Sequence, residues 1–293
     1  MARIAVIVGC GSKHDRGGTV TEFAPAVRFG LGGALAIGFA KSSSFDHVLL
    51  LSRCAICLNS VHATGCFSCP RPAHRRQELL DLVKAEVEAE AGPGVATTMV
   101  CDATSDTDVA AAFDAARGLG IVECIVWNVA PGFPKDGPTG ETVSFGNLPS
   151  PHEVDPEYLN SAFDIGVTGC LRFARHFIPY FVEQGRGSFL VSGATMALRG
   201  GPKFGALAPI KCALRSYCQS LSQTYHKQNV HIAHVIIDGV IDSPNTRSWG
   251  ANVMLMDPGD LAEAYIALHH QPKTVWSHEI QLTPGQDSLG HRL

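Results

Sequence analysis

Four cysteines in two closely spaced pairs are the clearest candidates for metal chemistry in this sequence. Cys54 and Cys57 form one CxxC pair, and Cys66 and Cys69 form a second pair after eight intervening residues. Thiolates spaced in this way can surround Zn²⁺ tetrahedrally, and a short segment without its own core gains stability from such a metal. The spacer is shorter than the roughly 15–20 residues of the usual zinc ribbon. The pattern predicts a structural zinc, with a loop of free cysteines as the alternative.

Glycines at alternate positions form a second candidate site, suited to phosphate. Gly9 and Gly11 follow an apolar run, and Gly30 and Gly32 begin another glycine series after a long gap. With residues 13–29 looped out, the sequence reads as a strand, alternate glycines and the start of a helix. Glycine is needed where a backbone turns tightly and approaches a pyrophosphate bound at a helix N-terminus. The spacing therefore predicts a dinucleotide site that an insertion interrupts.

Apolar β-prone runs alternate with helical stretches along the chain. We expect strands at Arg3–Val8, His47–Leu51, Val95–Val100, Ile121–Trp127, Ser188–Val191, His231–Ile237 and Val275–Leu282, and helices at Gln77–Ala91, Asp106–Arg117, Pro156–Glu183, Ile210–Lys227 and Pro258–His269. Strands separated by helices pair in parallel, and ligands bind beyond their carboxyl ends. The prediction is an α/β fold with a Rossmann-type, doubly wound parallel sheet. It comprises one domain over residues 1–293, with insertions at about 13–29 and 54–74.

The composition excludes several classes of function. Apolar residues make up 45% of the chain and charged residues 17%, so the chain can bury a core and is not disordered. The net charge is −4 and the basic residues are scattered, so neither nucleic acid nor membrane is an expected partner. The first apolar run is too short for a secretory segment, and the ten cysteines then indicate a reducing compartment. We expect a cytoplasmic protein; an organelle matrix is also compatible with these features.

In their order and spacing, the motifs resemble those of the short-chain dehydrogenase/reductase family from residue 3 to about 283. The resemblance implies a nicotinamide dinucleotide cofactor. Arg53 stands where NADPH-preferring members carry a basic residue for the 2′-phosphate, so NADP(H) is favoured over NAD(H). Asp102 stands at the adenine-contacting position, and Asn128 at the first Asn of the family's NNAG motif. Taken alone, Arg53 is more often a solvated charge, and Asp102 could cap the following helix.

Residues 238–244 resemble the PG-x-x-x-T stretch that lies beside the nicotinamide in the family. Asp238 replaces the proline and Ser243 replaces the threonine. The resemblance assigns Gly239 and Ile241 to cofactor binding. Lys211 matches the family lysine that binds the nicotinamide ribose, although a surface lysine at a helix start is the alternative reading.

The resemblance fails where the family's chemistry resides. Members use a tyrosine one helical turn before this lysine, a serine upstream of it and an asparagine on the preceding long helix. Leu207, Ala194 and Gly166 occupy those three positions. Leucine cannot donate a proton, and loss of a general acid costs about 10²- to 10⁴-fold in rate.

Ser192 and Thr195 flank the vacant serine position and are the candidates for orienting a substrate oxygen. With Lys211 they make up the expected catalytic set. A water molecule held by Thr195 and Lys211 is the proton donor that this set would offer, because hydroxyl groups of high pKa are poor acids.

Two functions follow from these residues. The first is an NADP(H)-binding oxidoreductase that acts slowly or atypically on a small carbonyl or alcohol. The second is a catalytically silent dinucleotide-binding protein with a structural or regulatory role. Residues 258–283 resemble the family's last helix and strand, which commonly pack across a two-fold axis, so we expect a homodimer or homotetramer. Both insertions lack a counterpart in the family, and errors in the gene model would also explain them.

The zinc prediction can be tested directly on purified protein. A site at Cys54, Cys57, Cys66 and Cys69 predicts about one zinc ion per chain, released on mild acidification as the thiolates are protonated. Elemental analysis before and after acidification measures both quantities, with a Cys54→Ser, Cys57→Ser double variant as the control. A preparation without zinc would leave the loop of free cysteines as the correct interpretation.

Overall fold

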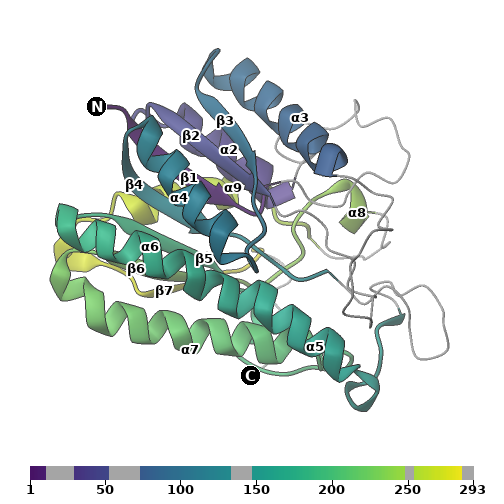
Figure 1. Cartoon of the computed structure of the whole chain (residues 1–293). Helices are drawn as coiled ribbons and strands as arrows, with labels where there is room; N and C mark the ends of the chain where they lie inside the picture. Colours follow the sequence, from purple (N-terminus) through teal and green to yellow (C-terminus); the bar gives the residue numbers. More distant parts are fainter. Residues whose placement is uncertain (11–29, 53–72, 133–146, 248–253, 286–293) are drawn as a thin grey trace.

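A parallel sheet forms the centre of the protein (Figure 1). The computed structural model describes residues 1–10, 30–52, 73–132, 147–247 and 254–285. Within these ranges one sheet of seven strands has the order β3-β2-β1-β4-β5-β6-β7. The strands are β1 Arg3–Val8, β2 His47–Ser52, β3 Ala96–Val100, β4 Ile121–Trp127, β5 Ser188–Ser192, β6 His231–Ile237 and β7 Glu279–Leu282. This is the predicted doubly wound α/β fold.

Helices cover both faces of the sheet (Figure 1). One face packs against α2 Gly30–Lys41, α3 Ala73–Ala91 and α9 Pro258–His269, and the other against α4 Asp106–Leu119, α6 Gly169–Gln184 and α7 Leu207–Tyr225. Helix α5 Pro156–Phe163 and the short helix α8 Pro244–Arg247 lie towards the carboxyl ends of the strands. Because both faces are covered, the strands read as continuous apolar runs such as RIAVIV and HIAHVII.

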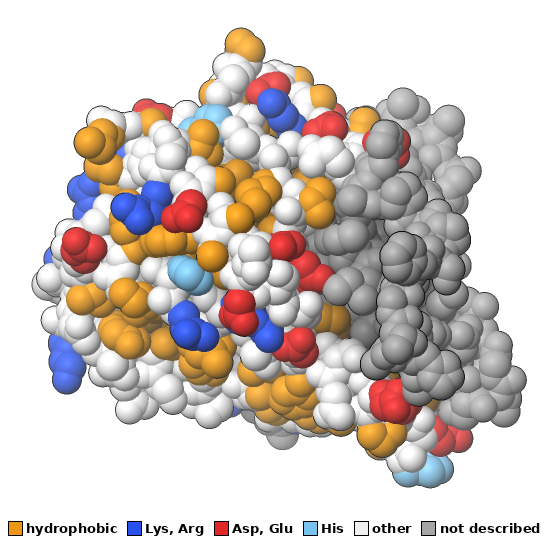
Figure 2. All heavy atoms as spheres, viewed as in Figure 1, with side chains coloured by type: hydrophobic (Ala, Val, Ile, Leu, Met, Phe, Trp, Pro, Cys, Tyr) orange, Lys and Arg blue, Asp and Glu red, His pale blue; other side chains and the backbone are white. Residues whose placement is uncertain are grey.

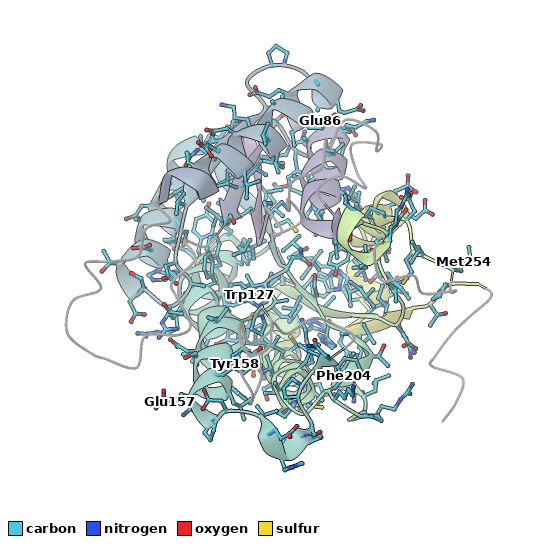
Figure 3. All side chains as sticks on the ribbon, turned by 90° about the vertical axis from the view of Figure 1, so that its right-hand side faces the viewer. Glu86, Trp127, Glu157, Tyr158, Phe204 and Met254 are labelled. Carbon is cyan, nitrogen blue, oxygen red and sulfur yellow. The ribbon has the colours of Figure 1, made fainter. Side chains whose placement is uncertain are left out.

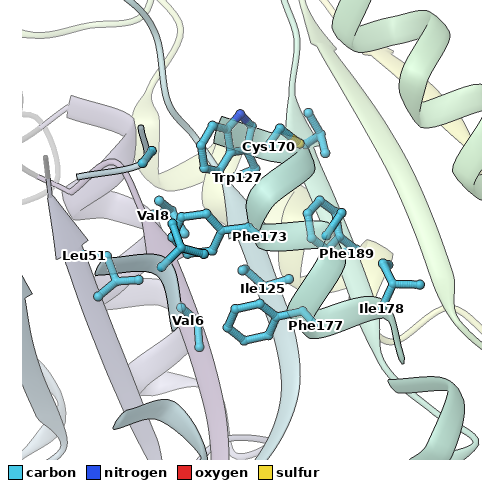
Figure 4. Packing of buried hydrophobic residues seen from close by; sticks show 14 of the residues in the cluster. Val6, Val8, Leu51, Ile125, Trp127, Cys170, Phe173, Phe177, Ile178 and Phe189 are labelled. Carbon is cyan, nitrogen blue, oxygen red and sulfur yellow. The ribbon is translucent and has the colours of Figure 1, made fainter. Parts of the chain in front are cut away.

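Aromatic side chains fill the core between the sheet and helices α4 and α6 (Figure 4). The Trp127 ring of β4 lies 5.3 Å from the Phe173 ring, which stacks on Phe177 at 6.0 Å. Phe113 of α4 meets Phe177 edge to face at 5.1 Å. Such geometries are favourable for aromatic pairs beyond the area that they bury.

The last strand begins later than we predicted. The expected strand Val275–Leu282 is wrong in its first half, because Lys273–Val275 forms a 3-10 turn and β7 starts at Glu279. The indole Nε1 of Trp276 donates a hydrogen bond to the Gln271 carbonyl at 2.9 Å, which holds the chain in this turn.

The long helix expected at Pro156–Glu183 is present and contains a π turn in its first half. A π turn at Asp164–Thr168 separates α5 from α6, and the Gly169 N–H donates to the Asp164 carbonyl across it. A Cβ on Gly169 would lie 3.0 Å from both Ala103 Cβ and Trp127 Cη2, so the backbone here approaches its neighbours closely. Helix α3 also begins at Ala73, which is one residue before the expected end of the second insertion and four residues before the expected helix start at Gln77.

The surface that α4, α6 and α7 form carries intermixed apolar and charged side chains (Figure 2). A mixture of this kind is ordinary for a protein surface. In the described ranges, no helix has both the length and the apolar character needed to cross a membrane.

The aromatic core makes a stability prediction. Phe177 is fully buried, so Phe177→Ala should lower the free energy of unfolding by about 3–5 kcal/mol through lost contacts and a new cavity. Leu82→Ala is the control, because Leu82 is 54% exposed and its truncation should change stability by less than about 0.5 kcal/mol. Urea denaturation followed by circular dichroism measures both, and equal effects would contradict the packing that we describe.

Candidate functional site

The turn after β1 brings three backbone segments into close contact. Gly9 has a φ of +97°, and a Cβ at this position would lie 2.5 Å from the Asn128 carbonyl oxygen. A Cβ on Gly32 would lie 2.5 Å from the Gly9 carbonyl oxygen. Glycine is therefore required at both positions for β1, α2 and the segment after β4 to meet.

This contact lies where the strand order reverses direction. Strand β1 pairs with β2 on one side and with β4 on the other. The Gly9 N–H donates to the Leu51 carbonyl at 2.8 Å, and the Asn128 N–H donates to the Val8 carbonyl at 2.9 Å. Open α/β sheets bind ligands beyond the carboxyl ends of the strands at such a switch point.

Helix α2 starts at the same edge. Gly30 is its first residue and has a φ of +60°, and the amides of a first helical turn are suited to phosphate. Three of the predicted glycines, Gly9, Gly30 and Gly32, therefore belong to one strand-to-helix junction. Gly11 lies outside the described residues.

Asp102 follows β3 and is buried. Its Oδ1 accepts hydrogen bonds from the N–H and the hydroxyl of Thr104, at 2.9 and 2.8 Å. The N-cap of α4 is Ser105, whose side chain accepts from the Asp108 N–H. The alternative in which Asp102 caps this helix is therefore wrong, and its contact with adenine stays a prediction.

Arg53, Cys54, Cys57, Cys66 and Cys69 lie outside the described residues. Among the residues that are described, no group of three or more histidine, cysteine or acidic side chains is arranged to hold a metal ion. The 2′-phosphate contact and the zinc site stay predictions.

Lys211 is a buried lysine in the first turns of α7. Its side chain is 5% exposed, and Nζ donates to the Ser192 carbonyl at the end of β5, at 3.1 Å. Desolvation lowers the pKa of this amine to about 8, because burial disfavours its charged form. The alternative reading as a surface lysine is therefore wrong. An amine buried in this way at the carboxyl edge of a sheet is a candidate functional group.

The hydroxyl of Ser192 is directed away from α7. Ser192 Oγ shares a hydrogen bond of 2.7 Å with the Tyr265 hydroxyl of α9, on the opposite face of the sheet. Burial raises the pKa of Tyr265, so this phenol stays protonated. The serine is thereby engaged within the core, and its predicted role with a substrate finds no support in this geometry.

Thr195 makes a different contact. Its Oγ1 donates to Asp238 Oδ1 at 2.5 Å, and Asp238 Oδ2 accepts from Gln281 Nε2 at 2.8 Å. Asp238 is fully buried, whereas Thr195 is partly exposed. In the family resemblance, Asp238 appears only as a replacement for proline. A charged residue directly after a buried strand was the signal that should have marked it.

The structure places Leu207 and Gly166, two of the positions that the resemblance assigns to the family's catalytic residues. Leu207 begins α7 one turn before Lys211, and Gly166 lies in the π turn. A Cβ on Gly166 would lie 2.9 Å from Ile210 Cγ2, so an asparagine there would require Ile210 to move. These positions therefore offer neither a proton donor nor room for the usual amide.

The segment after β6 is tied to Met256. Ile241 and Met256 form a parallel bridge, and the Met256 N–H donates to the Val240 carbonyl at 2.8 Å. A Cβ on Gly239 would lie 2.7 Å from Met256 Sδ. The predicted cofactor-binding residues Gly239 and Ile241 are thus held at the carboxyl edge of the sheet.

A partly buried ionic cluster, which no sequence motif indicates, joins α7, β6 and β7. Arg215 donates hydrogen bonds of 2.7 and 2.8 Å to Glu279, and His234 Nδ1 lies 3.2 Å from the same carboxylate. Burial lowers the pKa of His234 to about 4, so the ring is neutral. His234 Nε2 has no partner among the described residues, and a Cβ on Gly193 would lie 2.4 Å from it. The His234 ring therefore leaves room only for glycine at position 193, two residues before Thr195.

A tyrosine does lie on this side of the molecule, although not at the family position. Figure 3 looks onto the carboxyl edge and shows Tyr158 of α5 below Trp127, with Phe204 to its right in this view. The Tyr158 hydroxyl donates to the Gly132 carbonyl at 2.6 Å, and burial raises its pKa to about 12. Burial therefore makes this phenol a weaker acid than a free tyrosine.

Comparison with known proteins identifies the class. A family model described as enoyl-(acyl carrier protein) reductase matches residues 75–262, which is more than half of the chain. An uncharacterised oxidoreductase of Staphylococcus saprophyticus is 28% identical over 134 residues, 45% of this chain and 56% of that protein. The match thus spans little more than half the length of this curated relative.

Solved structures match over nearly the whole chain. A short-chain dehydrogenase from Rhodopseudomonas palustris has a TM-score of 0.66 at 24% identity, covering 97% of this chain and 98% of that one. Serine dehydrogenase complexed with NADP⁺ has a TM-score of 0.69 at 16% identity, with coverages of 97% and 96%. A 7α-hydroxysteroid dehydrogenase bound to NADH and 7-oxoglycochenodeoxycholic acid has a TM-score of 0.69 at 17% identity, with coverages of 97% and 93%. Identities this low show the fold alone.

The switch-point site and these matches define a protein with a doubly wound, NAD(P)-binding type of fold. The chain belongs to the short-chain dehydrogenase/reductase family.

Burial of Lys211 predicts a specific dependence of stability on pH. Its pKa is about 8 in the folded chain and about 10.5 when unfolded, so the unfolded state binds more protons between these values. This group therefore destabilises the folded state below pH 8, and the penalty disappears as the pH rises to about 10.5. Lys211→Met has no such penalty. Its stability relative to the wild type should fall by up to ~3 kcal/mol across that window.

Urea denaturation at several pH values measures this difference. Lys84→Met is the matched control, because the Lys84 side chain on α3 is 39% exposed and its amine is therefore not buried. A stability difference between Lys211→Met and the wild type that does not vary with pH would contradict a depressed pKa.

Proposed function

We propose that this protein is an NADP(H)-binding oxidoreductase that acts slowly or atypically on a small carbonyl or alcohol. The observation that carries the proposal is the buried Lys211, whose amine reaches the Ser192 carbonyl at 3.1 Å. Burying an amine is costly, and a protein that only needed a packed core would gain from an apolar side chain there. Retention of the lysine at the family position therefore supports a role with a ligand.

The strand-to-helix junction fits a dinucleotide. Gly9 and Gly32 let α2 begin directly against the end of β1, beside Asn128, so that amides at the start of the helix are available to a pyrophosphate. Two of the similar solved structures are described as complexes with NADP⁺ and NADH. When bound, the nicotinamide would supply the hydride acceptor or donor. The preference for NADP(H) rests on Arg53.

The rival proposal is a catalytically silent dinucleotide-binding subunit. Leu207 and Ala194 remove the family's proton donor and its partner hydroxyl, and the contact of Gly166 with Ile210 closes the position of its asparagine. These observations favour slow catalysis or none. They leave the cofactor site untouched, since the glycines and Lys211 are separate from them.

Two measurements made in sequence separate these functions. Titration with NADPH, followed by the fluorescence of the bound nucleotide, tests the cofactor site. A single-turnover assay of NADPH oxidation with a small aldehyde such as 4-nitrobenzaldehyde then tests hydride transfer. Binding with transfer supports the oxidoreductase, and binding without transfer supports the silent subunit. A protein that binds neither NADPH nor NADH would contradict both proposed functions.

The cofactor preference makes its own prediction. If Arg53 contacts the 2′-phosphate, Arg53→Ala should weaken NADPH binding by about 10- to 100-fold, the loss of a charge-assisted contact, and leave NADH nearly unchanged. Arg186→Ala is the control. Arg186 pairs with Glu123 at the amino ends of the strands, just before β5 begins. Equal weakening of both dinucleotides would contradict the assignment.

We also propose that the protein is a homodimer or homotetramer. Strand β7 is the edge of the sheet, and Val275, which precedes it, is 62% exposed. Homo-oligomers with closed symmetry commonly bury such a surface against the same surface of a second copy. Light scattering at micromolar concentration should give at least twice the chain mass, and Val275→Glu should weaken the assembly. A monomeric wild type would contradict the proposal.

A further inference from the structure

The contact between Thr195 and Asp238 joins two loops at the carboxyl edge of the sheet. Thr195 Oγ1 donates to Asp238 Oδ1 at 2.5 Å, a short hydrogen bond of the kind that a carboxylate accepts from a hydroxyl. Thr195 lies just beyond β5 and Asp238 directly follows β6, and these strands are neighbours in the sheet. Both residues therefore lie where ligands of such sheets bind.

The carboxyl group of Asp238 is costly to bury if its only role is to link the two loops. Asp238 is fully buried, and in the described part of the chain both donors that reach it, Thr195 and Gln281, are uncharged. Burying a carboxylate without a cationic partner costs much more than burying a neutral amide. An asparagine could link the same loops at lower cost, so a purely structural link does not explain the choice of a carboxyl group at this position.

The two residues differ in their access to a ligand. Asp238 has no exposed surface and cannot touch a substrate itself. Thr195 is partly exposed and stands next to Ala194, the position of the family's missing serine. Its hydroxyl can accept a hydrogen bond from a ligand while it donates to Asp238. A proton can therefore pass from a ligand oxygen through Thr195 to the buried carboxylate.

We propose that Thr195 and Asp238 form a proton-transfer pair that takes the place of the missing tyrosine; this inference rests on the oxidoreductase function proposed above. In alcohol oxidation, the substrate hydroxyl gives its proton to Thr195 Oγ1 as the Thr195 proton moves to Asp238 Oδ1. The electron pair of the substrate C–H bond leaves as hydride to the oxidised nicotinamide, and the C–O bond becomes C=O. Asp238 holds the proton until the product leaves, and the proton then returns through the partly exposed Thr195 hydroxyl to water. Carbonyl reduction is the reverse sequence.

In this scheme Thr195 is the catalytic residue and Asp238 a positioning residue that acts through it. Asp238→Asn is the informative substitution, because an amide keeps a hydrogen-bonded link between the loops and cannot take up a proton. Thr195→Val removes the hydroxyl at nearly constant shape. Thr195→Ser restores the hydroxyl and serves as the rescue variant.

The test uses the full chain, NADPH and 4-nitrobenzaldehyde as the carbonyl probe, whose reduction produces an alkoxide that must be protonated. Thr195→Val and Asp238→Asn should each lower the single-turnover rate at saturating NADPH by about 10- to 100-fold, the low end of general acid effects. The double variant should be no slower than the slower single variant, because residues that act in series are not additive. Thr195→Ser should recover most of the rate, and the loss should fall on kcat rather than KM.

Two further measurements separate a proton role from a structural one. NADPH affinity and Tm should be retained in Asp238→Asn, and the exposed controls Thr224→Val and Asp260→Asn should keep the full rate. A rate loss that follows a loss of Tm or of NADPH binding, or independent multiplicative losses in the double variant, would overturn the pair. Active wild type with unaffected Thr195 and Asp238 variants would overturn the pair and leave the oxidoreductase standing. A wild type that binds NADPH and transfers no hydride would overturn both.

Discussion

The contact of three backbone segments at Gly9 is the constraint on which the site depends. With a Cβ at Gly9 or Gly32 the end of β1, the start of α2 and the segment after β4 could not meet, because each Cβ would lie 2.5 Å from a carbonyl oxygen. The meeting of these segments sets the position of the helix N-terminus relative to the switch point of the sheet. The place that we propose for a dinucleotide is thus set by main-chain atoms and does not depend on the side chains at positions 166, 194 and 207.

Ionisable groups are concentrated around the ends of β5 and β6, on the side of the sheet that α7 covers. Lys211, His234 and Asp238 are each at most 5% exposed, and each reaches a partner on a neighbouring element. Groups of this kind are rare in cores because burial opposes their charged forms. Their presence together marks this part of the carboxyl edge as the region of the described chain where buried polar groups meet.

The sequence predicted the order of strands and helices well, because apolar runs buried on both faces are visible without a structure. It failed where tertiary contacts decide local conformation. The hydrogen bond from Trp276 to the Gln271 carbonyl holds the chain in a turn before β7 begins. Close packing at Gly169 accompanies the π turn within the long helix. The candidate site was predicted in part. Gly9, Asn128 and Lys211 could be recognised from motifs, whereas the Thr195–Asp238 contact joins residues 43 apart and needs the pairing of β5 with β6.

The π turn at Asp164–Thr168 has a consequence for how this helix could change over evolutionary time. Because the Gly169 N–H bonds to the carbonyl five residues back, the segment holds one residue more than an α-helix would use for the same turn. Deletion of a single residue there would leave a continuous α-helix with α5 and α6 nearly in place, whereas a deletion elsewhere in either helix would rotate one apolar face by about 100° away from the core. The π turn is thus the point at which this part of the protein can absorb a change of chain length.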